Sequence, residues 1–162
     1  PYTSSAASDV YKRQSLGTVT VTGDIDVTYS ITGQSATGVL GTPTISSNVT
    51  EYAVTVAYGT NSYGSGNKFY IDGVLSPTLS LSEGNTYKFD QSNSSNATHP
   101  LRFSTTANGT HNGGSEYTTG VTTNGTPGSS GAYTQIVVAV GAPTLYYYCT
   151  NHSGMGGQAN TP

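Results

Sequence analysis

The chain has 162 residues, only 8% of them charged against about 25% in a typical globular protein, and its formal net charge is −3. This balance argues against nucleic-acid binding, which needs a basic surface. No run of residues is long and apolar enough to span a bilayer, and a single cysteine excludes an internal disulfide. Abundant Thr, Ser, Val, Gly and Asn favour strands and turns over helices, so we predict an all-β protein.

Residues 4–14, with the sequence SSAASDVYKRQ, match the translation of a transposase-type sequencing-library adapter along their whole length. Chance is a poor explanation for a match that covers the entire segment. We therefore predict that residues 1–14 are not biological and that the sequence is metagenomic, with its natural N-terminus missing. Like an expression scar, the segment is left out of the functional argument.

Residues 15–62 contain a repeat. The sequence LGTVTV at 16–21 recurs as LGTPTI at 40–45, and each copy is followed by a polar break and an alternating run of apolar and small polar residues. Alternation indicates half-buried strands, and a repeated strand–turn–strand unit indicates a modular array. The segment has no histidine or cysteine. We predict a repetitive β segment that acts as a spacer or surface module, joined to the next domain by a glycine-rich linker at 63–66.

Residues 67–162 are predicted to form the domain that carries the functional site. Short strand-like runs follow one another with turns between them, which is typical of an antiparallel sandwich or barrel. These runs lie at 68–71, 78–81, 86–89, 100–103, 133–140 and 144–149. A stretch rich in Gly, Thr and Asn, from 105 to 131, lacks strong periodicity.

The last strand leads into the segment with the most distinctive chemistry, which has the spacing Cys149-x-x-His152-x-x-Met155. It holds the only cysteine and the only methionine of the chain. Thiolate, imidazole and thioether are soft or borderline donors, and histidine and cysteine in a trigonal site with a weak axial methionine form a blue-copper ligand set. A further donor must come from upstream, and His99 is the best candidate.

The strand before the cysteine predicts where the thiol points. In an extended strand Leu145, Tyr147 and Cys149 share one face, while Tyr146 and Tyr148 share the other. If the first face packs into the core, the sulfur enters the core at the end of the strand. A tight turn can then return the next histidine beside the sulfur, and the glycine before the methionine lets that side chain approach.

The sequences LSLSEGNTYKFDQSNSSNATHPLRFS (79–104) and TLYYYCTNHSGM (144–155) resemble the cupredoxins, the type 1 blue-copper proteins, and the short ligand loop is similar to that of amicyanins. The resemblance covers about residues 67–157. It implies an antiparallel Greek-key β-sandwich in which His99, Cys149, His152 and Met155 bind one copper ion. It also implies one-electron transfer with a redox partner protein, not an enzymatic reaction, and an extracytoplasmic location.

Two features depart from the family pattern. Pro100 follows the first predicted ligand, where many cupredoxins have a residue whose backbone N–H bonds the cysteine sulfur, and proline has no such donor. This argues against a normal blue-copper site. The family also usually closes with a strand, whereas Gly156-Gly157-Gln158 is a poor strand sequence.

The Ser/Thr/Gly-rich composition and the repeats resemble β-rich appendage or virion proteins of tailed phages. This second resemblance implies that the domain belongs to a larger multidomain or virion assembly. The alternative hypothesis for function is a structural or adhesive β module with no redox role. Paired carboxylates or a Ser/His/Asp set in a plausible context are not found, so a hydrolase is not expected.

Each candidate residue has a less specific explanation. Cys149 can be an ordinary buried thiol and Met155 can simply fill a gap in the core. His111, in the polar sequence GTHNGG, is predicted to be a solvated loop residue. The discriminating observation is the direction of His99: ligand atoms converging within a few ångström favour copper, and a side chain pointing away from Cys149 favours the structural module.

Overall fold

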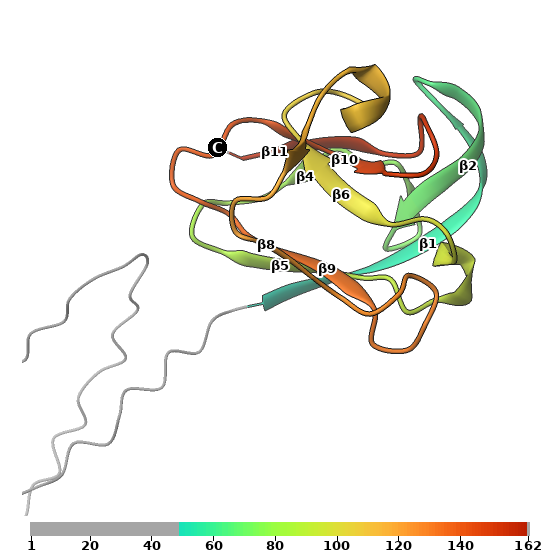
Figure 1. Ribbon diagram of the computed structural model, residues 1–162, viewed down its shortest axis with the longest axis horizontal. Helices are drawn as coiled ribbons and strands as arrows, with labels where there is room; N and C mark the ends of the chain where they lie inside the picture. The colour runs from blue at the N-terminus through green and yellow to red at the C-terminus, as the bar shows by residue number, and fades with distance from the viewer. Residues whose placement is uncertain (1–48, 162) are drawn as a thin grey trace, which may run out of the picture. The chain divides into compact units, whose positions relative to one another are not determined.

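The computed structural model describes residues 49–161, which fold into two β-sheets packed face to face (Figure 1). The strands are β1 (Val49–Asn61), β2 (Gly64–Ile71), β3 (Val74–Leu75), β4 (Leu79–Ser80), β5 (Thr86–Asp90), β6 (Leu101–Ser104), β7 (Glu116–Tyr117), β8 (Val121–Asn124), β9 (Tyr133–Val137), β10 (Leu145–Cys149) and β11 (Gly157–Asn160). Two short 3-10 turns, η1 (Ser94–Asn96) and η2 (Gly109–Asn112), are the only helical elements in this part of the chain. The all-β prediction is confirmed. Residues 1–48, which include the adapter and both copies of the repeated sequence at 16–21 and 40–45, lie outside the described residues.

The order of strands in one sheet is β3-β2-β1-β5-β9-β8, and in the other it is β4-β11-β10-β6-β7. Most neighbours are antiparallel, but β1 pairs with β5 in parallel, and so does β11 with β4. The two sheets are therefore mixed, where the sequence predicted antiparallel pairing throughout. The Greek-key topology stays a prediction. Within residues 49–161, no helix has the length and apolarity needed to cross a membrane.

Residues 63–66, predicted to be a linker, instead form part of the turn and the start of β2 in a β1–β2 hairpin. Asn61 pairs with Gly64 across the turn of a β1–β2 hairpin, and the pairing continues to Val54 and Ile71. Gly64 has φ of +93°, a conformation that suits glycine. Because the same small polar residues serve flexible linkers and tight turns, composition alone could not separate the two. Strand β1, which was assigned to the repetitive segment, lies between β2 and β5 and belongs to the site-bearing domain.

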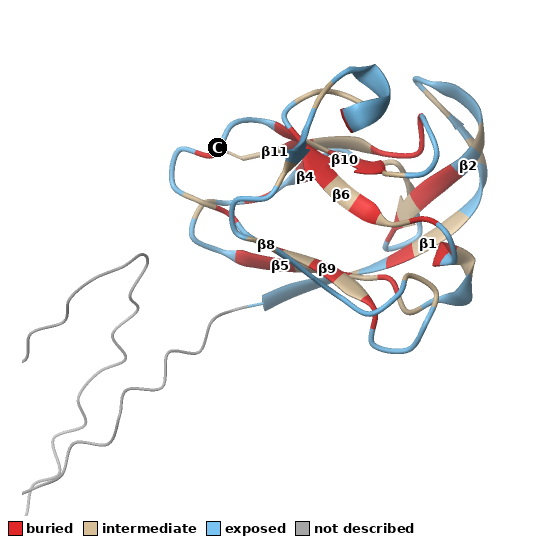
Figure 2. Cartoon of the chain, viewed as in Figure 1, coloured by how far each residue is buried: buried red, intermediate tan, exposed pale blue. Residues whose placement is uncertain are grey.

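The apolar core fills the space between the two sheets, where Figure 2 shows the buried stretches of the strands. Phe89 of β5 and Phe103 of β6 meet edge to face there, with ring centroids 5.4 Å apart. Leu145, Tyr147 and Cys149 all belong to this core cluster. The predicted alternation of β10 is thus confirmed, and it carries the thiol into the interior at the strand's end.

A closing strand is present after the ligand loop. Strand β11 pairs with β10, with Gly157 opposite Tyr147 and Ala159 opposite Leu145. A Cβ on Gly156 would collide with the Tyr147 carbonyl, and one on Gly157 would lie 2.7 Å from the Tyr147 hydroxyl. The glycines that make this a poor strand by propensity are therefore required by the close approach of the Tyr147 backbone to Gly156 and of the Tyr147 side chain to Gly157.

Candidate metal centre

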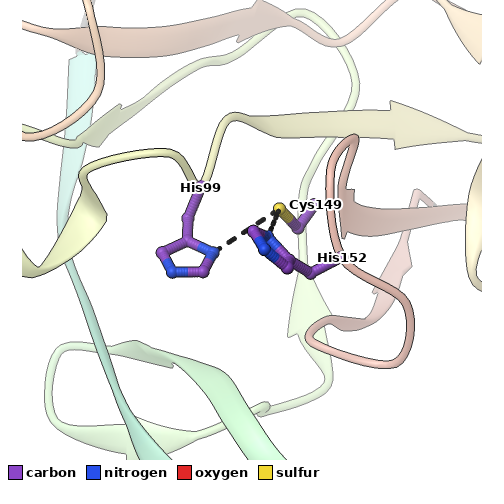
Figure 3. A group of neighbouring side chains, drawn as sticks. All are labelled: His99, Cys149 and His152. Atoms are coloured by element: carbon purple, nitrogen blue, oxygen red, sulfur yellow. Dashed lines mark hydrogen bonds between the residues drawn. The ribbon is translucent and has the colours of Figure 1, made fainter.

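His99, Cys149 and His152 converge on one point between the two sheets at one end of the domain (Figure 3). His99 lies just before β6, Cys149 ends β10, and His152 lies in the turn that follows. The Nδ1 atoms of the two histidines are 3.8 and 3.7 Å from the cysteine Sγ. The potential ligand atoms of all three residues lie within 4.8 Å of one another. Three of the four predicted ligands are therefore close enough together to bind a metal ion.

The site is buried on one side and open on the other. Cys149 is 0% exposed and His99 is 7% exposed, whereas His152 is exposed. Burial lowers the pKa of His99, and the neighbouring His152 lowers it further. Neutral imidazole is the form that binds metal, so this environment prepares His99 as a ligand.

Two opposing effects act on the pKa of the Cys149 thiol. Burial raises the pKa of the Cys149 thiol, while the backbone N–H groups of Asn151 and His152 act in the opposite direction. The backbone after Pro100 does not serve the sulfur, because the Leu101 N–H donates to a side-chain oxygen of Gln91 at 3.1 Å. The effects that favour the Cys149 thiolate therefore come from the backbone of Asn151 and His152, not from the segment after Pro100.

Buried amide side chains hold His99 in place. The Gln91 side chain donates to the His99 carbonyl at 2.8 Å, and the His99 N–H donates to the Asn96 carbonyl at 2.8 Å. Thr98 has φ of +68°, which is rare for a β-branched residue, and its carbonyl accepts a hydrogen bond from Asn151 at 2.9 Å. Strain of this kind persists only where the surroundings hold it, and it clusters at functional sites. No local pattern in the sequence predicts this network.

The loop between His152 and Met155 is held by side chains from both flanks. Asn108 accepts a hydrogen bond from the Gly154 N–H at 2.7 Å and donates to the Ser153 hydroxyl at 2.8 Å. From the other flank, Lys68 of β2 donates to the Gly154 carbonyl at 2.6 Å. The ligand loop is therefore positioned before any ion binds.

Met155 is 1% exposed and belongs to the same core cluster as Cys149. Its carbonyl accepts hydrogen bonds from the Phe69 N–H at 2.9 Å and from the Ser76 hydroxyl at 3.2 Å. These contacts fix the backbone of Met155. Its role as an axial ligand stays a prediction.

His111 is exposed, as predicted, but it is not simply solvated. Its Nε2 lies 2.9 Å from the Cys149 carbonyl oxygen, and its ring meets the Tyr148 ring edge to face with centroids 6.3 Å apart. Because a carbonyl can only accept, Nε2 carries the proton. His111 lies in η2, whose packing over β10 could not be predicted from local periodicity. It is not part of the converging cluster, but it touches the backbone of the cysteine in that cluster.

Comparison of the chain with protein-family models, with curated protein sequences and with solved structures finds no match. The kind of metal that the site can bind is therefore inferred from its own side chains, His99, Cys149 and His152. One thiol and two imidazoles, brought together where β10 ends and β6 begins, can hold a soft or borderline transition-metal ion.

Proposed function

We propose that residues 49–161 form a cupredoxin-like domain that binds one copper ion and exchanges one electron at a time with a redox partner protein. The convergence of a buried cysteine sulfur with two histidine Nδ1 atoms, from segments 50 residues apart, is the observation that carries this proposal. A purely structural role gives no reason for three metal-binding side chains to meet at one point.

The donor set fits copper. Thiolate and imidazole also suit zinc, but a structural zinc site is closed by a fourth ligand of the same kind, and no fourth cysteine, histidine or carboxylate joins the cluster within residues 49–161. The thioether of Met155, which is buried in the same core cluster as Cys149, would instead be the weak donor that completes a copper site. When bound, copper supplies a one-electron redox couple.

The chain's own residues would provide rigidity and access. Gln91 and Lys68 donate hydrogen bonds to the segments that carry the ligands, and Asn108 accepts one from the Gly154 N–H. These bonds hold the donor atoms near one another and would limit rearrangement when the charge of the site changes. His152 is exposed, so its side chain would give a partner protein access to the site. In line with the Ser/Thr/Gly-rich composition, we propose that the domain acts outside the cytoplasm, on a larger surface or virion-associated protein.

Titration of the chain with Cu(II), followed by visible absorption, tests this proposal. An intense charge-transfer band is expected, and Cys149→Ser should abolish it because a hydroxyl is a much harder donor. Met155→Leu should keep copper bound and raise the reduction potential, since losing the weak axial donor favours Cu(I).

Two histidine variants provide the matched control. His99→Ala should remove a ligand and weaken copper binding strongly, whereas His111→Ala should leave the band nearly unchanged. If His111→Ala has the larger effect, the upstream ligand is wrongly assigned. If the wild type shows no band with copper in excess, the blue-copper proposal fails and a structural or adhesive module takes its place.

A further inference from the structure

Lys68 is a charged side chain buried beside the ligand loop. It is 3% exposed, and its Nζ donates to the carbonyl of Gly154 at 2.6 Å. The two salt bridges formed within residues 49–161 join other side chains, Lys88 to Glu51 and Arg102 to Glu116. A buried ammonium is costly unless it is compensated, so this placement calls for an explanation.

The contacts of Lys68 attach its charge to the loop that follows Cys149. Gly154 lies between His152 and Met155, and Phe69, the next residue of β2, donates its N–H to the Met155 carbonyl at 2.9 Å. The 2.6 Å contact of the amine is shorter than a usual neutral N–H···O bond, as expected when the donor is ionised. A fixed positive charge is thus attached to the loop that carries two of the predicted ligands.

We infer that Lys68 sets the oxidation-state preference of the site and makes it bind Cu(I) more tightly relative to Cu(II). The inference rests on the proposed function. When the site takes one electron from a redox partner protein, its charge falls by one unit. A fixed positive charge nearby therefore repels the oxidised form more than the reduced form.

The size of this effect follows from Coulomb's law. A unit charge acting through an effective dielectric of about 20 changes an equilibrium by about tenfold at a separation of about 12 Å, and by more at shorter separations. We therefore expect Lys68 to raise the ratio of Cu(I) to Cu(II) affinities about tenfold, which corresponds to about 59 mV for a one-electron couple.

The test compares the whole chain with the variants Lys68→Met, Lys68→Gln and Lys88→Met. Affinities for Cu(I) and Cu(II) are measured by competition with chelators, and metal-free unfolding is measured separately. Both Lys68 variants should lose about tenfold in the affinity ratio. Lys88→Met should lose nothing, because Lys88 lies away from the ligand loop and pairs with Glu51 at 3.1 Å.

The outcomes separate charge from structure. If only Lys68→Met shifts the ratio, the hydrogen bond is responsible and the charge inference is overturned, because glutamine keeps a donor. If both variants keep the wild-type ratio, Lys68 is structural. Should Lys68→Met fail to fold, Lys68→Gln and the charge-retaining Lys68→Arg give the same comparison. Absence of a visible band in the wild type would instead overturn the proposed function itself.

Discussion

Two adjacent tyrosines of β10 should respond in opposite directions to the same substitution. The Tyr148 hydroxyl is buried and has no hydrogen-bond partner among the described residues. Burial raises the pKa of Tyr148, and the Thr110 side chain partly offsets this rise. The Tyr147 hydroxyl, on the other face of the strand, donates to the Pro77 carbonyl at 2.7 Å. Replacing each tyrosine by phenylalanine removes one hydroxyl and keeps the ring, so packing is nearly constant.

The expected magnitudes follow from the two environments. An unsatisfied buried hydroxyl costs about 1–3 kcal/mol, so Tyr148→Phe should stabilise the domain by about 1 kcal/mol or more. A satisfied hydrogen bond contributes about 1 kcal/mol, so Tyr147→Phe should destabilise by about that amount. For a domain of this size 1 kcal/mol corresponds to about 4 °C in the unfolding midpoint.

The assay is thermal and urea unfolding of the metal-free chain and both variants under identical conditions. The unfolding midpoint should be highest for Tyr148→Phe, intermediate for the wild type and lowest for Tyr147→Phe. A Tyr148→Phe variant less stable than the wild type would refute the reasoning, because it would mean that the Tyr148 hydroxyl is satisfied in solution. A change in copper binding in this variant would further indicate that the hydroxyl acts on the neighbouring Cys149.

Three further predictions concern the ligand loop, pH and the domain boundary. Asn108→Ala should cost about 1–3 kcal/mol in urea unfolding, because it leaves the buried Gly154 N–H without its acceptor, and Asn108→Asp, which keeps the acceptor, should cost less. The pKa of His99 is lowered in the folded state, so metal-free stability should be full above the ordinary histidine pKa of about 6.5. It should fall below that pH by at most about 1.4 kcal/mol per unit, and a His99→Gln variant that keeps the same slope would contradict the assignment. A fragment of residues 67–162 should lack cooperative unfolding, because it lacks β1, the strand between β2 and β5. A fragment of residues 49–162 should fold, and thermal melts of both fragments followed by circular dichroism test this.

The sequence determined the features that neighbouring residues encode together. Strand alternation over five residues, from Leu145 to Cys149, was enough to place the thiol in the core. The spacing from Cys149 to His152 was enough to bring the second imidazole back to the sulfur across one turn. Low charge and abundant Thr, Val and Gly were enough for the all-β class. Each of these depends on local geometry, which is fixed by residues a few positions apart.

Tertiary structure decided everything that depends on contacts between distant segments. The approach of His99 to Cys149 could be proposed from residue type, but only the pairing of β6 with β10 brings the two residues together. The strand that carries Lys68 was predicted, but its contact with Gly154, 86 residues away, was not. The hydrogen bonds of Asn108 and His111 to the ligand loop and its cysteine have no local signal, because their Gly- and Asn-rich segment has no periodicity. The turn between β1 and β2 resembled a linker for the same reason. Small polar residues permit many backbone conformations, and only the sheet around them selects one.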